Sequence, residues 1–343
     1  MRFRTESGTE SGTEKGTEKG TEKGTGMQAS KILVQLTPFA KGPDPAIQMA
    51  VSLAKRWGAA LTLFDIETDL PWPLQYLVGG IEEALESVTG TKHHLMQQRC
   101  EEVRQEGIAV EHRLTKGRQA VELIREVIKE GHDLVVKVAD DSGPNRSGFL
   151  GSTDYRLLRK CPCTLLILRH DEQPGFQHVA AALDVLDDHP LQAELDQRVA
   201  EAAHSICDGT LELIYAMPSV RDAIEVNQID RDLITPEQME KWDADLHRQA
   251  LDKLQERVRE LGVVATARVL AGEPEEAIRC FVEEQQIDLL AMGTLARSGL
   301  DGMLIGNTAE RILKHVTCSL LALKPADFVS PVEVEIPSAE SEE

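Results

Sequence analysis

A glycine-rich segment late in the sequence carries the residues best suited to bind an anion. Residues 291–308 read Ala-Met-Gly-Thr-Leu-Ala-Arg-Ser-Gly-Leu-Asp-Gly-Met-Leu-Ile-Gly-Asn-Thr. Glycine lets the backbone turn tightly and expose successive N–H groups, which can hold a phosphate. A helical pattern follows over 309–315, and its first turn would add unpaired N–H groups and a positive dipole end. Arg297 would add a positive charge.

The same segment also has a purely structural interpretation. Asn307 can cap the following helix, and Glu310, three residues later, would complete a capping box. The loop by itself therefore leaves both interpretations open.

Cys161 and Cys163, separated by one proline, form a second group of residues that could carry out chemistry. Residues two apart on a strand point to the same face, so the thiols could form a redox pair or, with His170 or the His93-His94 pair, a metal site. No second ligand pair stands at a fixed spacing, and Cys318 takes the place of Cys163 in the repeat described below. We therefore expect buried, reduced thiols and no metal site.

Motifs of common enzyme classes are missing from the sequence. It contains no Gly-x-Ser-x-Gly, no Walker lysine, no His-Glu-x-x-His and no Cys/His cluster at zinc spacing. Acidic residues are abundant, but none form a convincing pair at matched strand ends. The sequence therefore predicts a protein that is not an enzyme.

Composition limits the partners that the chain can have. Its 343 residues predict two or three domains, and 37 basic against 58 acidic residues give a net charge of −21. Such a charge disfavours nucleic acid and anionic membrane surfaces as partners. The sequence shows neither a signal peptide nor an apolar stretch long enough to span a membrane, so we expect a cytoplasmic protein.

The chain repeats itself once. Residues 133–138 match 288–293, and the same offset of 155 residues relates Gly151 to Gly306 and Cys163 to Cys318. Each half alternates helical stretches with five short, continuously apolar runs, which are typical of strands buried on both faces. The runs lie at 31–37, 60–66, 108–115, 133–139 and 163–169, and at 178–184, 210–216, 263–270, 287–293 and 318–324. This order predicts an α/β fold with a five-stranded, parallel, doubly wound sheet in each half, and ligands at the carboxyl ends of the strands.

Polar, low-complexity sequence marks the two ends. Residues 1–26, which include three TEKG repeats, are expected to be a disordered extension, with Met27 as the natural start. The domains then occupy 27–172 and 173–325, and 326–343 is expected to be an acidic, disordered tail.

Four segments of the second half together resemble the universal stress protein domain. They are Gly272-Glu-Pro, Ile287–Thr294, Gly306–Leu313 and Cys318–Pro325. The resemblance covers 31–170 and 178–325, so the chain is similar to tandem-domain members of that family. It implies two Rossmann-like domains of the adenine nucleotide alpha hydrolase-like type. It also implies that the halves pair through their final strands as an internal pseudo-dimer, with a homodimer of whole chains as a further arrangement.

The resemblance also places a candidate site. Nucleotide-binding members carry Gly-x-x-Gly, nine residues, then Gly-Ser or Gly-Thr. Counted from Gly293, this spacing holds, with Ala296 and Asn307 as two departures from the motif. The adenine side falls on Asp184 and Ala216, at the ends of the first and second strands of the second half. The candidate ligand-binding residues are Asp184, Ala216, Gly293, Thr294, Ala296, Arg297, Gly306, Asn307 and Thr308.

The first half departs further from the motif. Thr37 replaces the aspartate, and both leading glycines of the loop are lost. Asp140, Asp141 and Asp154 would repel a polyphosphate. We therefore expect this half not to bind nucleotide, and Gly151-Ser152 to cap a helix.

The resemblance implies a non-enzymatic stress-response protein that supports resistance to starvation, oxidative or DNA-damaging conditions. Three modes of action stay open: a ligand-sensing or scaffold module without nucleotide, a binder of ATP or AMP, and a weak nucleotide hydrolase. The apolar loop 71–78 adds an apolar ligand as an alternative, although packing against the protein itself is the favoured interpretation.

Overall fold

A computed structural model describes residues 29–37, 42–67, 81–140, 150–226, 234–294 and 305–334. The predicted extension 1–26 and the apolar loop 71–78 lie outside the described residues.

Both halves fold as the alternating strands and helices that the apolar runs predict. In the first half the elements are β1 (Lys31–Gln35), α1 (Pro45–Trp57), β2 (Ala60–Glu67), α3 (Ile81–Gln105), β3 (Val110–Lys116), α4 (Gln119–Glu130), β4 (Leu134–Val138), α5 (Ser152–Lys160) and β5 (Thr164–Leu168). In the second they are β6 (Phe176–Ala182), α6 (Pro190–Ile206), β7 (Cys207–Met217), α7 (Val220–Val226), α8 (Pro236–Leu261), β8 (Thr266–Ala271), α9 (Pro274–Glu284), β9 (Leu289–Gly293), α10 (Asn307–His315) and β10 (Ser319–Leu323).

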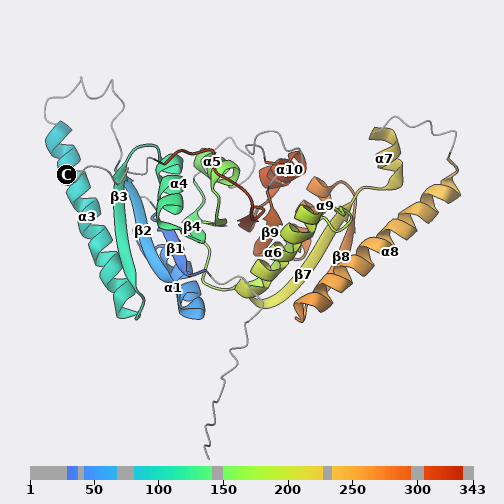
Figure 1. The fold of residues 1–343 in the computed structure, drawn as a ribbon, viewed down its shortest axis with the longest axis horizontal. Coiled ribbons are helices and arrows are strands. Elements are labelled where there is room, and N and C mark those ends of the chain that lie inside the picture. Colours follow the sequence, from blue (N-terminus) through green and yellow to red (C-terminus); the bar gives the residue numbers. More distant parts are fainter. Residues whose placement is uncertain are drawn as a thin grey trace, which may run out of the picture.

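The ten strands form one continuous sheet in the order β3-β2-β1-β4-β5-β10-β9-β6-β7-β8 (Figure 1). All neighbours within a half are parallel. The two halves meet through the antiparallel pair β5–β10, in which Leu166 lies opposite Leu321. Each final strand thus covers the backbone groups that the other would expose at an edge. The predicted pairing of the final strands is confirmed.

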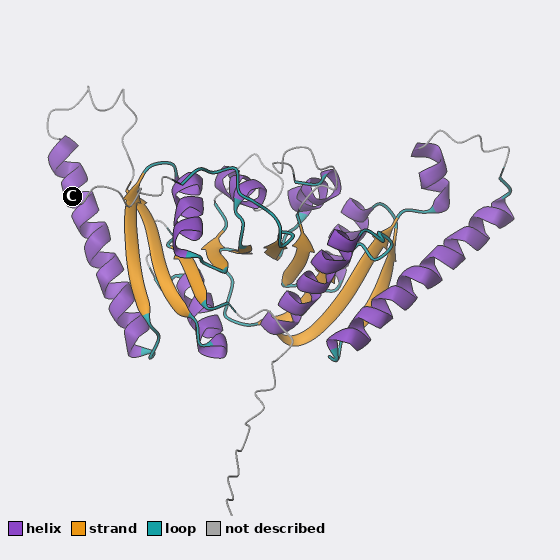
Figure 2. Cartoon of the chain, in the orientation of Figure 1, coloured by secondary structure: helices purple, strands orange, loops and turns teal. Residues whose placement is uncertain are grey.

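Alternating side chains give the sheet two apolar faces, each covered by helices (Figure 2). Ile32 and Val34 of β1 pack into one buried cluster with residues of α1, α3, α6 and α8. Leu33, between them, packs into the other cluster with residues of α4, α5, α9 and α10. Burial on both faces explains why the strand sequences are continuously apolar.

The helix boundaries follow local sequence signals. At α1, Asp44 accepts a hydrogen bond from the Ala46 N–H, and the helix ends at Gly58, whose φ of 70° favours glycine. At α8, Thr235 and Gln238 form a reciprocal capping box. Side-chain caps and a left-handed glycine thus set these boundaries.

The long helices α3 and α8 lie at the two ends of the sheet (Figure 1). They have 25 and 26 residues and are largely polar. Neither these nor any other helix in the described part of the chain is long and apolar enough to cross a membrane.

The seam between the halves is also bridged by side chains. Tyr155 Oη of α5 donates to the Leu313 carbonyl of α10 at 3.3 Å. After β10 the chain runs back over the first half (Figure 1), where Arg125 Nε of α4 donates to the Glu333 carbonyl at 3.2 Å. Glu333, in the described part of the expected acidic tail, therefore contacts the first half.

Candidate functional site

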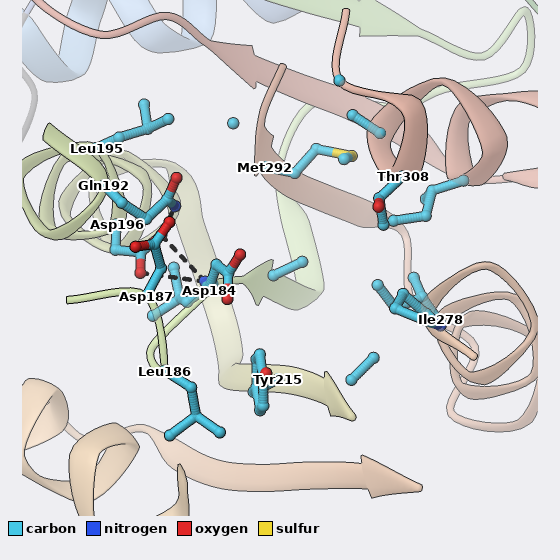
Figure 3. A pocket seen from close by; sticks show the side chains of 18 of the residues that line it. Asp184, Leu186, Asp187, Gln192, Leu195, Asp196, Tyr215, Ile278, Met292 and Thr308 are labelled. Carbon is cyan, nitrogen blue, oxygen red and sulfur yellow. Dashed lines mark hydrogen bonds between the residues drawn. The ribbon is translucent and has the colours of Figure 1, made fainter. Parts of the chain in front are cut away.

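A cavity of about 790 Å³ lies in the second half, where β6, β7 and β9 end and α10 begins (Figure 3). This volume falls within the range of small-molecule sites, and the carboxyl edge of a parallel sheet is where such sites form. The described lining residues are Ala182, Leu183, Asp184, Leu186, Asp187, Gln192, Leu195, Asp196, Tyr215, Ala216, Pro218, Pro274, Ile278, Met292, Gly293, Gly306, Asn307, Thr308, Ala309 and Ile312.

The structure brings most of the candidate site residues together around this cavity. Those that line it are Asp184, Ala216, Gly293, Gly306, Asn307 and Thr308. Ala296 and Arg297 lie outside the described residues.

Thr294 is not among the lining residues. Its side chain is buried, donates to the Leu323 carbonyl at 3.3 Å and accepts from Lys324 Nζ at 2.9 Å. Burial lowers the pKa of this lysine to about 8. The Thr294 hydroxyl therefore serves the packing around β10 rather than the cavity.

Gly293 allows a close approach between β9 and α6 at the cavity wall. A Cβ atom at this position would lie 2.6 Å from Cδ2 of Leu195, which is closer than side-chain atoms pack. A larger residue here would force the Leu195 side chain to move, so close packing rather than backbone conformation favours glycine, since Gly293 is not among the glycines with positive φ.

The start of α10 corrects one prediction. Gly306 is the N-cap, without a side-chain cap hydrogen bond, and Asn307 is already the first helical residue. The predicted capping box of Asn307 and Glu310 is therefore wrong, because a capping side chain must come from the residue before the first helical one. The first N–H groups of α10 have no intrahelical partners and begin at the cavity wall.

Three aspartates gather on the opposite side of the cavity, and two of them were not predicted. Asp184 follows β6, Asp187 lies in the loop after it, and Asp196 lies on α6 (Figure 3). Asp196 is 3% exposed and accepts from the Asp184 N–H at 3.1 Å and from Gln192 Nε2 at 2.7 Å.

Burial raises the pKa of Asp196 to about 7. The hydrogen bond from Gln192 and the charge of Arg257 oppose this shift, whereas Asp187 reinforces it. A strongly shifted carboxyl group beside a cavity is a frequent mark of a functional site. Asp196 could have been suspected from the sequence, because it interrupts the apolar face that Leu195 and Val199 form on α6.

The two sides of the cavity differ in charge. One side offers backbone N–H groups and the positive dipole end of α10, which favour an anion. The other offers three aspartates, and no described lining residue is basic. Apolar side chains such as Ile278 and Met292 also line the cavity. The arrangement suits a ligand with a short anionic group at one end and hydrogen-bond donors at the other.

The first half fills the corresponding place with an ion cluster of its own. Lys137 and Asp154 occupy the positions of Met292 and Ala309, at the repeat offset of 155 residues. Lys137 is 1% exposed and forms short ion pairs with the fully buried Asp154 and, at 2.8 Å, with Asp140. The carboxylates that were expected to repel phosphate are thus engaged internally; Asp141 lies outside the described residues.

Asp154 also determines how α5 begins. Its Oδ2 accepts from the Gly151 N–H at 2.7 Å, and Gly151 is the N-cap of a helix that starts at Ser152. The sequence predicted that Gly151-Ser152 would cap this helix, and the structure confirms Gly151 as the N-cap. A Cβ atom on Gly151 would lie 2.4 Å from Cβ of Asp140, so the chain packs too closely here for a larger residue.

We expect Asp196→Asn to stabilise the second half more at about pH 8 than at about pH 5. The native carboxyl holds its proton up to about pH 7, whereas its ordinary pKa is 3.8. Ionisation of Asp196 therefore lowers the free energy of unfolding as the pH rises between these values. The full cost is on the order of 4 kcal/mol, because one pKa unit corresponds to about 1.4 kcal/mol.

Urea unfolding of the wild type and the variant at both pH values measures this effect. Asp187→Asn, at a cavity aspartate that is only half-buried, is the control and should show no comparable gain. If the difference in free energy of unfolding between the wild type and Asp196→Asn did not change with pH, the raised pKa of Asp196 would be contradicted.

Comparisons with known proteins agree on one family. A model of the universal stress protein family matches residues 29–169 and 175–324. Universal stress protein E of Escherichia coli (strain K12) is 26% identical over 307 residues, which cover 85% of this chain and 93% of the relative.

Solved structures share the fold. A Pseudomonas aeruginosa PAO1 protein of unknown function is 22% identical and has a TM-score of 0.65, covering 88% of this chain and 94% of that chain. A universal stress protein from Archaeoglobus fulgidus DSM 4304 is 18% identical with a TM-score of 0.58, covering 87% and 97%. Because the matched segments span both halves, the chain belongs to the universal stress protein family.

Proposed function

We propose that the chain is a non-catalytic, cytoplasmic stress-response protein that senses a small ligand in the cavity of its second half. The family and the named relatives support the stress-response role. The observation that carries the ligand-binding part is the cavity itself, with an anion-binding helix end on one side and three aspartates on the other.

The ligand class that fits best is an adenine nucleotide such as AMP or ATP. A phosphate would accept hydrogen bonds from the first N–H groups of α10. The base would lie between apolar side chains, with its amino group directed to the aspartates. Asp184 and Asp196 have carboxylate oxygens that can accept from such donors. The cavity volume of about 790 Å³ is sufficient for a molecule of this size.

Isothermal titration of the full chain with AMP and with ATP, each with and without magnesium, tests this proposal. We expect saturable binding of at least one of these ligands. Mass spectrometry of protein purified without added ligand provides a second readout, because a retained molecule would appear directly. Failure of all four titrations, with no retained molecule, would contradict the proposal.

A phosphate-release assay in the same samples distinguishes binding from hydrolysis. No release above a protein-free blank is expected for a sensing module. Release that is lost in a variant of the cavity would instead favour the weak hydrolase.

A further inference from the structure

Two thiols of the first half lie in direct contact. Cys161 Sγ and Cys163 Sγ are 3.6 Å apart and share a hydrogen bond. Cys161 is the C-cap of α5, and Cys163 precedes the first residue of β5. The segment between the two elements therefore brings together side chains that a straight strand would hold further apart. Pro162 restricts the backbone between them.

The second half shows that the fold itself does not require this pair. Cys318 occupies the position of Cys163, but Val316 occupies that of Cys161, again at an offset of 155 residues. Val316 is likewise the C-cap of its helix. A valine thus fits the place of Cys161, and the paired thiols belong to the first half alone.

The two thiols differ in their access to solvent. Cys161 is fully buried, whereas Cys163 is only partly buried. The hydrogen bond shared with Cys161, and burial, raise the pKa of the Cys163 thiol. Burial likewise raises the pKa of Cys318 to about 12, and that residue is 1% exposed. Cys163 is the most exposed thiol of this group, and its reaction with a small reagent should become faster as the pH rises.

We propose that Cys161 and Cys163 form a thiol–disulfide exchange site at which a small disulfide converts the pair into an intramolecular disulfide. The Cys163 thiolate attacks one sulfur of the reagent, forms a mixed disulfide and releases one thiol. The Cys161 thiolate then attacks the Cys163 sulfur and releases the second thiol. In total, the protein dithiol loses two protons and two electrons, and the reagent becomes two thiols.

The geometry leaves only a short movement for this closure. The sulfur atoms must approach from 3.6 Å to about 2.05 Å, the length of a disulfide bond. Cys163 lies outside the regular part of β5, so its side chain can turn without breaking the strand pairing of Thr164 with Leu134. No group of three metal-ligating side chains is found among the described residues, which favours exchange chemistry over a metal site here.

Oxidised glutathione is the probe for the test. Reduced, full-length protein is incubated with it at about pH 8, quenched in acid, treated with a thiol-blocking reagent and digested with trypsin. Cleavage after Lys160 and Arg169 gives the peptide 161–169, which contains Cys161 and Cys163 and no other cysteine. We expect most of this peptide to be unblocked and lighter by two hydrogens, while Cys318 stays reduced.

Cys161→Val, which copies the second half, removes the resolving thiol and should leave a persistent glutathione on Cys163. Three results in the wild type would overturn the proposal. They are a fully blocked peptide 161–169, a glutathione adduct that accumulates without closure, and a disulfide that joins this peptide to Cys318. Circular dichroism of the oxidised protein checks that the reaction occurs in the folded chain.

Discussion

Gly306→Asp is expected to abolish binding of an anionic ligand while leaving the protein as stable as before. Gly306 is the N-cap of α10 and lines the cavity. Its φ of −56° is accessible to any L-amino acid. Aspartate is a better N-cap than glycine, so the helix should gain slightly in stability.

The same substitution places a negative charge where the anion would lie. Two like charges about 4 Å apart in a partly hydrated site repel each other by about 4 kcal/mol. Since about 1.4 kcal/mol corresponds to tenfold in affinity, about 4 kcal/mol corresponds to roughly a thousandfold, and we expect AMP to bind roughly a thousandfold more weakly. Titration calorimetry measures the affinity, and urea unfolding measures the stability.

Gly306→Asn is the matched control. Asparagine is an equally good N-cap and has nearly the shape of aspartate, but it carries no charge. Its affinity for AMP should stay within a few-fold of the wild type. If both variants lost binding equally, the cause would be steric and the anion site at α10 would be contradicted.

Asp154→Ala is expected to destabilise the first half by about 3–5 kcal/mol, because it leaves Lys137 charged and buried beside only Asp140. It also removes the carboxylate that accepts from the Gly151 N–H at the start of α5. Urea unfolding followed by circular dichroism should show this as an earlier first transition. A loss below about 1 kcal/mol would show that the cluster is not an important part of this half's stability.

The second half supplies the control for this experiment. It carries Met292 and Ala309 at the positions of Lys137 and Asp154, and both are buried there. The double variant Lys137→Met/Asp154→Ala therefore copies a combination that this fold already accommodates. The buried lysine is removed together with Asp154, and Asp140, which loses its ion pair with Lys137, is 26% exposed to solvent. We therefore expect the double variant to recover most of the lost stability.

Much of the fold follows from the sequence for an identifiable reason. The continuously apolar runs and the repeat offset of 155 residues predict two parallel sheets, because only strands covered on both faces need no polar side. The pairing of β5 with β10 was implied by the resemblance to the family, and in the structure each of these strands covers the edge of the other.

The site was predictable only in part. Residues next to strand ends, such as Asp184 and Ala216, lie at the cavity because the carboxyl edge of the sheet is fixed by topology. Asp187 and Asp196 could not be placed in the same way, because the path of the loop after β6 and the rotation of α6 depend on tertiary packing. Their presence changes the expected site from a phosphate cradle to a cavity with the N-terminal end of α10 on one side and acidic side chains on the other.

The ion cluster of the first half shows a similar limit. The sequence predicts repulsion between its aspartates and a phosphate, but it does not show that Lys137, in the middle of a buried strand, points toward them. The contact requires β4 and α5 to be packed together, with Asp154 on the first turn of the helix. An internal lysine thus supplies the positive charge for these carboxylates.

Counting bound nucleotides on the intact chain by native mass spectrometry distinguishes one ligand site per chain from two. The proposed ligand site lies in the second half, whereas an internal ion cluster fills the corresponding place in the first. We therefore expect AMP to saturate at one molecule per chain, and Gly306→Asp, but not Gly306→Asn, to eliminate this species. Saturation at two molecules per chain, or one molecule that persists in Gly306→Asp, would contradict it.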